Sequence, residues 1–167
     1  EVRLLDEAGR PVADGTEGEI CVRGDVVMKG YWNDSNVNAK ALRDGWLHTG
    51  DVGRFEDGYL YLLSRMNDVI ISGGSNIYPR EVEDVLLLHP AVKEACVFGA
   101  PDDKWGEAVV AAVVASSPVS ADELQALCKE HIASFKKPKR IAFVEALPKN
   151  AYGKVLRRQV KENLTST

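Results

Sequence analysis

The stretch SRMNDVIISGGSNIYPREVE, residues 64–83, decides the fold of this chain. It contains an apolar run at Val69–Ser72, then the pair Gly73-Gly74, and then a segment opened by Pro79 whose apolar residues recur at helical spacing as far as His89. An apolar run between polar residues predicts a strand, and a proline at the start of an amphipathic stripe predicts a helix. The stretch therefore predicts a strand, a glycine break and a helix, which marks the start of an α+β unit.

The residues before this stretch have the pattern of a small β-rich unit. Short apolar clusters between Gly, Pro and Asp turns predict strands at residues 2–5, 19–23, 52–55 and 59–63. The last two flank Asp57-Gly58, which is a hairpin turn signal. Asp34-Ser35 is expected to cap a brief helix that runs through Leu42 and is ended by Asp44-Gly45. We assign residues 1–66 to this unit.

After the stretch, predicted strands and helices alternate. Strands are expected at residues 94–99, 108–115 and 141–144. Ser120 to Glu123 reads as a capping box for a helix that ends near His131, and Leu156, Val160 and Leu164 form the stripe of a last helix. The fold class predicted is α+β, with a small β-rich subdomain followed by a small α+β domain over residues 67–167. The boundary is expected near Arg65–Asp68.

Composition limits the class of protein. The chain has 167 residues, of which 45% are hydrophobic and 28% charged, which is typical of globular domains and not of disordered chains. It contains no apolar run of about 18 residues and no signal-peptide pattern, so we expect a cytoplasmic protein. Cys21, Cys96 and Cys128 are widely spaced and form no CxxC pair, so neither a disulfide framework nor a metal site is predicted.

Charge is distributed unevenly along the chain. The formal net charge is −4, yet residues 129–158 hold nine Lys or Arg against Glu130 and Glu145. Such a segment suits a phosphorylated ligand or nucleic acid, and it equally suits a solvated surface. The basic residues are Lys129, Lys136, Lys137, Lys139, Arg140, Lys149, Lys154, Arg157 and Arg158.

Four local motifs could carry chemistry, and each also has a plain structural interpretation. Lys154 follows Gly153, but the phosphate-binding P-loop is excluded because Val155 stands where Ser or Thr is required. Asp51, in HTGD at the mouth of a predicted strand, could accept hydrogen bonds from a ribose diol or simply form a turn. Gly73-Gly74 could border a narrow ligand or form a bulge, and Trp105 could stack on a base or pack half-buried.

The order of five motifs is more specific than any one of them. These are TGD at 49–51, the opening stretch at 64–83, GE-VVA-VV at 106–114, FKKPKR at 135–140 and PKNAYGKVLRR at 148–158. Together they resemble the adenylate-forming enzymes, the superfamily of acyl- and aryl-CoA ligases, luciferase-like enzymes and peptide-synthetase adenylation domains. The wording GGSNIYP and the stretch KPKR look most like an acid–CoA ligase.

This resemblance implies a role for each motif. Residues 1–66 would be the last, partial subdomain of a large AMP-binding domain, and residues 67–167 a mobile C-terminal lid with its hinge at Asn67, where Asp or Lys is usual in the family. Asp51 would hold the ribose hydroxyls of ATP, Arg65 would assist at the ribose or phosphates, and Lys154 would be the catalytic lysine of acyl-adenylate formation. The CoA and pantetheine positions would be Gly73, Gly74, Trp105, Phe135 and Lys137.

The implied reaction activates a carboxylate as acyl-AMP and transfers the acyl group to the thiol of CoA. Its cofactors would be ATP, CoA and the Mg²⁺ that accompanies ATP, with the Mg²⁺ ligands and the phosphate loop in an N-terminal domain expected before Glu1. The chain is thus expected to be a C-terminal fragment that is inactive alone. Two alternatives stay open: an adenylation domain that loads a carrier-protein phosphopantetheine, and a non-catalytic basic module that binds nucleic acid.

Overall fold

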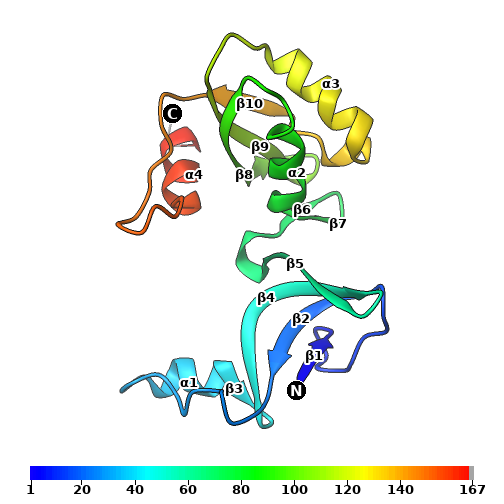
Figure 1. The fold of residues 1–167 in the computed structure, drawn as a ribbon, viewed down its shortest axis with the longest axis vertical. Coiled ribbons are helices and arrows are strands. Elements are labelled where there is room, and N and C mark those ends of the chain that lie inside the picture. The colour runs from blue at the N-terminus through cyan, green and yellow to red at the C-terminus, as the bar shows by residue number, and fades with distance from the viewer. Residues whose placement is uncertain (166–167) are drawn as a thin grey trace. The chain divides into compact units, whose positions relative to one another are not determined.

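The computed structural model describes residues 1–165, and it divides into two compact units (Figure 1). The first unit is Glu1–Asn67 and the second begins at Asp68. Strands and helices are mixed, and all but one of the strand pairs are antiparallel. The predicted α+β class is confirmed.

The first unit is a five-stranded antiparallel sheet in the order β1-β2-β4-β3, with β5 also paired to β4. A small core of Leu5, Cys21 and Trp46 lies against it. The elements are β1 (Val2–Leu5), β2 (Glu17–Val22), α1 (Ser35–Ala41), β3 (Leu42–Arg43), β4 (Trp46–Glu56) and β5 (Tyr59–Arg65).

The turns of this unit follow from local chemistry. The side chain of Asp34 accepts a hydrogen bond from the backbone N–H of Val37 at 2.9 Å, which caps α1 as predicted. Asp57-Gly58 joins β4 to β5 with positive φ at both residues, as a two-residue hairpin requires. Asp44-Gly45 has the same geometry. It therefore joins β3 to β4, and the expectation that this pair ends the helix is wrong because α1 already ends at Ala41.

The expected start of the fourth strand is also wrong. β4 begins at Trp46, so residues 48–51 lie inside the strand and not at its mouth. His48 pairs with Cys21, and Val52 pairs with Glu19. Between these two pairs β4 advances by four residues, whereas β2 advances by only two. The surplus residues form a bulge in which Gly50 has a φ of 72°. A bulge and a turn both favour Gly and Asp, which is why the sequence suggested a turn.

The second unit is built on a sheet in the order β10-β9-β6-β7, with β8 also paired to β9. The strands β8 and β9 form a long hairpin, and β10 runs parallel to β9. The elements are η1 (Met66–Asp68, which crosses the boundary), β6 (Ile70–Ser72), β7 (Ser75–Ile77), α2 (Pro79–Leu86), β8 (Val92–Asp102), β9 (Gly106–Ala115), α3 (Ala121–His131), η2 (Ser134–Lys136), β10 (Arg140–Phe143) and α4 (Arg157–Thr165).

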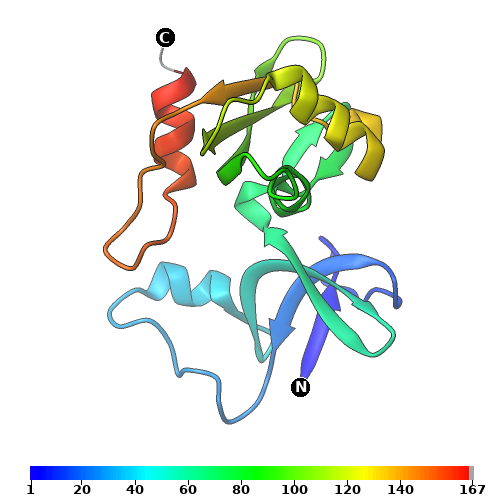
Figure 2. The same cartoon turned by 45° about the horizontal axis from the view of Figure 1, so that its top comes forward.

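Both faces of this sheet are covered. Val109 and Val113 of β9 pack into a core with α2 and α3, whereas Val110 and Val114 pack into a second core with α4. The helices accordingly lie on opposite sides of the strands in both ribbon views (Figures 1 and 2). A strand buried on both faces has a continuous apolar sequence, and this explains the run AVVAAVVA at residues 108–115. Among the described helices, none has both the length and the apolar composition needed to cross a membrane.

Candidate functional site

Asp51 and Arg65 face each other across the first sheet. They are register partners on β4 and β5, and the guanidinium Nε of Arg65 lies 2.9 Å from Oδ1 of Asp51. Thr49 Oγ1 accepts from the backbone N–H of Asp51 at 3.1 Å and donates to the carbonyl of Ile20 at 2.8 Å, which ties the bulge to β2. The bulge thus presents a fixed carboxylate beside an exposed guanidinium, a pair that can contact a diol and a phosphate.

A cluster of Glu19, Cys21 and His48 lies next to the bulge, and sequence reasoning missed it. Nδ1 of His48 is 2.7 Å from Oε2 of Glu19 and 3.3 Å from Sγ of Cys21. Burial, with a further contribution from the Glu19 carboxylate, raises the pKa of Cys21 to about 11. These residues are metal-ligand types, but the guanidinium of Arg43 already lies 2.9 Å from the same Nδ1.

The cluster supports the bulge directly, because Oε1 of Glu19 accepts from the backbone N–H of Gly50 at 3.2 Å. Its members come together through the register of β2 against β4. That register is a non-local property, so spacing along the chain could not have revealed the cluster.

A pocket with a volume of about 260 Å³ lies in the second unit. It contains four of the predicted CoA-site residues, Gly73, Trp105, Phe135 and Lys137, which come from three separate segments. Gly74 and Lys154 do not line it. Sequence reasoning had not assigned the other lining residues to a site, and these are Ser72, Ser75, Ser134 and Lys139.

Trp105 is held in this pocket by backbone and side-chain contacts. The carboxylate of Asp102 accepts from the N–H of Trp105 at 3.0 Å, and the carbonyl of Trp105 accepts from the N–H of Gly73 at 2.9 Å. The ammonium groups of Lys104 and Lys139 lie 5.0 and 5.4 Å from the indole centroid. A hydrogen bond from Lys139 lowers the pKa of Asp102, which stays ionised. An aromatic wall between cations suits an aromatic base that carries phosphate.

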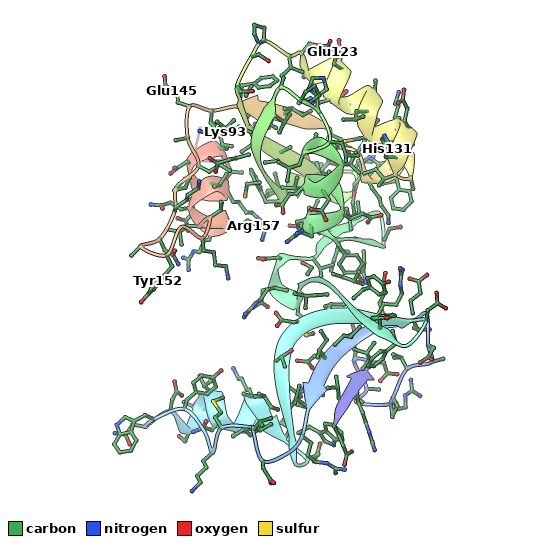
Figure 3. All side chains as sticks on the ribbon, in the orientation of Figure 1. Lys93, Glu123, His131, Glu145, Tyr152 and Arg157 are labelled. Atoms are coloured by element: carbon green, nitrogen blue, oxygen red, sulfur yellow. The ribbon has the colours of Figure 1, made fainter. Side chains whose placement is uncertain are left out.

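Lys154 lies on a tight loop before α4. Oδ1 of Asn150 accepts from the backbone N–H groups of Tyr152 and Lys154, both at 3.0 Å, and the N–H of Asn150 donates to the carbonyl of Lys154 at 2.9 Å. Gly153 completes the turn with a φ of 80°. Tyr152 projects from the loop (Figure 3). Lys154 is exposed, and within the described part of the second unit its ammonium forms no ion pair.

Arg157, three residues later, points the other way, into the second unit (Figure 3). Its Nη1 lies 2.7 Å from Oδ2 of Asp68, its Nη2 lies 2.6 Å from Oε1 of Glu83, and its Nε donates to the carbonyl of Val97 at 2.9 Å. Burial opposes the charge on Arg157, but the two carboxylates outweigh it and raise the pKa of the guanidinium. Sequence reasoning placed Arg157 only in the basic segment, because its partners lie 60 to 89 residues away.

Asn67, the predicted hinge, is an exposed residue of η1 and directly precedes Asp68. It is not among the described residues that have positive φ, so its backbone is ordinary here.

The basic segment is largely neutralised in the structure. Five of its nine cations form ion pairs with carboxylates of the same unit: Lys136 with Glu81, Lys139 with Asp102, Lys149 with Glu94, Arg157 with Asp68 and Glu83, and Arg158 with Glu162. A nucleic-acid surface needs cations that are free to meet phosphates. The pairing therefore weighs against the nucleic-acid-binding alternative.

Comparison with known proteins agrees with the order of the motifs. Residues 81–154 match the family model of the AMP-binding enzyme C-terminal domain, and residues 1–32 match that of the AMP-binding enzymes. A medium/long-chain-fatty-acid–CoA ligase of Mycobacterium tuberculosis is 46% identical over 170 residues, which cover 96% of this chain and 30% of the ligase. A 2-succinylbenzoate–CoA ligase of Bacillus cereus is 48% identical over 159 residues, which cover 95% of this chain and 33% of that enzyme.

Comparison with solved structures finds CoA synthetases as well. The o-succinylbenzoate CoA synthetase of Bacillus subtilis, in complex with its acyl-adenylate intermediate, superposes with a TM-score of 0.92 at 48% identity, covering 96% of this chain and 33% of that one. The same enzyme in complex with ATP and magnesium ion gives 0.90 at 46% identity, covering 96% and 34%. This chain spans about a third of the length of these relatives. It belongs to the superfamily of adenylate-forming, AMP-binding enzymes and corresponds to their C-terminal portion.

Proposed function

We propose that this chain is the C-terminal part of an ATP-dependent acid–CoA ligase, which activates a carboxylate as acyl-AMP and transfers the acyl group to the thiol of CoA. Residues 1–66 would complete the large AMP-binding domain, and residues 67–167 would form the mobile lid that turns at Asn67. The observation that carries the proposal is the presentation of Lys154. It stands on a braced loop and has no carboxylate partner among the described residues of the second unit, in a segment where most other cations are paired.

Lys154 would act in the first half-reaction. A carboxylate oxygen attacks the α-phosphorus of ATP, the new O–P bond forms, and pyrophosphate leaves. The negative carboxylate and the negative phosphate oxygens are brought close together, and an ammonium held beside them offsets their repulsion. Asp51 would hold the ribose hydroxyls of the nucleotide, and Arg65 would assist at the ribose or phosphates. Mg²⁺ would enter with ATP, and no residue of this chain is assigned as its ligand.

The pocket around Trp105 would receive CoA in the second half-reaction. Trp105 is 43% exposed and Phe135 is 57% exposed, so both rings have free surface for an adenine base. Lys137 would meet its phosphates, while Gly73 and Gly74 would border the pantetheine arm. The thiol then attacks the acyl carbonyl and AMP leaves. A carrier-protein phosphopantetheine lacks the adenine, so this pocket favours free CoA as the acceptor.

The relatives indicate which acids to test. Their names include 2-succinylbenzoate and medium or long-chain fatty acids, so aromatic and aliphatic carboxylates are both proposed substrates. The cytoplasmic location expected from the sequence stays a prediction.

The proposal is tested by Lys154→Ala in the full-length enzyme that carries this chain. We expect ATP–pyrophosphate exchange, driven by a panel of these acids, to fall by about 100-fold or more, because one charge-stabilising group at a transition state contributes that much. Thioester formation from a supplied acyl-adenylate should be nearly unchanged. An equal loss in both assays would contradict the role of Lys154, and a carrier protein accepted in preference to CoA would favour the alternative acceptor.

A further inference from the structure

We propose that Arg157 is a positioning residue for Lys154: by binding Asp68, Glu83 and the carbonyl of Val97 together, it fixes the base of the loop that presents the lysine. The inference rests on the proposed function, because it takes the role of Lys154 as given. It assigns Arg157 no contact with the substrate.

The guanidinium joins three parts of the second unit. Nη1 meets Asp68 at its start, Nη2 meets Glu83 on α2, and Nε meets the Val97 carbonyl on β8. Glu83 is only 9% exposed, and its Oε1 also accepts from the backbone N–H of Val97 at 2.8 Å. Arg157, Asp68 and Glu83 therefore each have an oppositely charged partner among these three residues. Loss of the guanidinium would leave a buried carboxylate unpaired, and such a group forces local rearrangement.

The segment between Lys154 and Arg157 is short and is held in place by several contacts. Three residues of chain span at most about 10 Å, even when fully extended. Val155 forms a bridge with Lys149 and packs against the apolar core under α4, and the N–H of Leu156 donates to the carbonyl of Pro148 at 2.9 Å. A displacement at the first turn of α4 would therefore pass into the loop and move the ammonium of Lys154.

The neighbouring arginine provides a matched control. Arg158 has the same charge and lies in the same turn, but its side chain is 92% exposed and pairs with Glu162 on its own helix, at 2.8 Å. Exposed pairs of this kind contribute little to stability. A lysine at position 157 is also informative. A single ammonium keeps the charge but cannot reach three acceptors in three directions.

The test uses the full-length enzyme with Arg157→Gln, Arg157→Lys and Arg158→Gln. For Arg157→Gln we expect kcat for ATP–pyrophosphate exchange to fall by about 10- to 100-fold, as a misplaced catalytic group causes. The KM for ATP should stay within about twofold, because the charge on Lys154 is retained. Arg157→Lys should be intermediate, and Arg158→Gln should match the parent.

A purely structural role of Arg157 gives a different result. If Arg157→Gln only lowered the folded fraction, adenylation and thioester formation from supplied acyl-adenylate would fall by the same factor, and that outcome would overturn the proposal. Asp68→Asn, combined with Arg157→Gln, gives a second test that does not depend on one variant folding well. The double variant should lose no more adenylation activity than Arg157→Gln alone, whereas multiplied losses would show that the two residues act separately.

Lys154→Ala, measured in parallel, separates this inference from the proposed function. If Lys154→Ala leaves adenylation intact, the proposed function fails. If it abolishes adenylation while Arg157→Gln acts on both half-reactions equally, only the inference about Arg157 fails.

Discussion

Gly73 has no side chain at the place where the indole of Trp105 comes closest to the backbone. A Cβ atom at this position would lie 2.7 Å from Cε3 of the ring, which is closer than such atoms approach in proteins. Its φ of 58° adds backbone strain for any other residue. Gly73 was assigned to pantetheine from the sequence. It therefore also determines the position of the Trp105 ring in the pocket.

We expect Gly73→Ala to displace Trp105 and to raise the KM of the full-length enzyme for CoA by about 10-fold, the loss of one aromatic contact. The KM for ATP should not change. The indole N–H resonance of Trp105 reports the displacement directly. Gly74→Ala serves as the comparison, because Gly74 also has positive φ but nothing lies within 4 Å of its added Cβ. If both variants move the resonance equally, backbone strain and not the ring contact is responsible.

The individual site residues show what a sequence can and cannot predict. Trp105, Phe135 and Lys137 were proposed for one site and do line one pocket, since the order of family motifs carries three-dimensional information. Asn150 and Glu83 were missed. Each acts through hydrogen bonds to backbone groups or to a distant arginine, and such contacts leave no periodic pattern in a sequence.

At the scale of elements, helix α3 shows how a local signal sets a boundary. The Ser120 hydroxyl accepts from the N–H of Glu123 at 3.2 Å, and the Glu123 carboxylate accepts from the N–H of Ser120 at 2.8 Å. This reciprocal pair is the capping box that the sequence predicted. The hydrogen bonds from Ser120 lower the pKa of Glu123 below its usual value of 4.5.

We expect Ser120→Ala to reduce the free energy of unfolding by about 1 kcal/mol at pH 7, measured by urea denaturation. Because the pKa of Glu123 is lower in the folded chain, its contribution is complete above the unfolded value and is lost as the pH falls through the folded value. Ser120→Ala keeps the backbone N–H bond to Glu123 and removes the bond from the hydroxyl, so the difference between parent and variant should narrow, by the share of that one bond, as the pH falls below 4.5. Ser117→Ala, at an exposed position just before the cap, is the control, and a pH-independent difference would contradict the explanation.

Elements defined by local signals were predicted, and those defined by pairing were not. Caps, hairpin turns and long apolar runs marked α1, α3, β8 and β9 within a few residues. The strand β7 was missed because Ser75 and Asn76 are polar, and it exists only through its pairing with β6. The bulge in β4 was missed for the same reason, since the register against β2 creates it.

At the scale of the whole molecule, each unit completes its own sheet and its own core. Asp51 and Arg65 belong to the first unit, whereas Lys154 and the Trp105 pocket belong to the second. The proposed reaction thus draws on residues from two bodies. It also requires the part of the enzyme that corresponds to the rest of the relatives, because this chain spans about a third of their length.

We expect the 167-residue chain by itself to show no ATP–pyrophosphate exchange, because the glycine-rich phosphate loop of the family is not among its residues. Adding the remainder of the enzyme as a separate polypeptide should restore measurable exchange if the two parts associate. Exchange catalysed by the chain alone, and abolished by Lys154→Ala, would show that nucleotide activation needs far less of the enzyme than we propose.

The division at Asn67–Asp68 has a consequence for recombination. Among the described residues, no strand pair joins the two units, and Asp68, which pairs with Arg157, is the first residue after the junction. A gene fusion made at this peptide bond would leave both β-sheets and the ion pair between Arg157 and Asp68 intact. Under the proposed function, the second unit could then be exchanged as a whole between CoA ligases, while a crossover placed further downstream would take Asp68 and Arg157 from different parents.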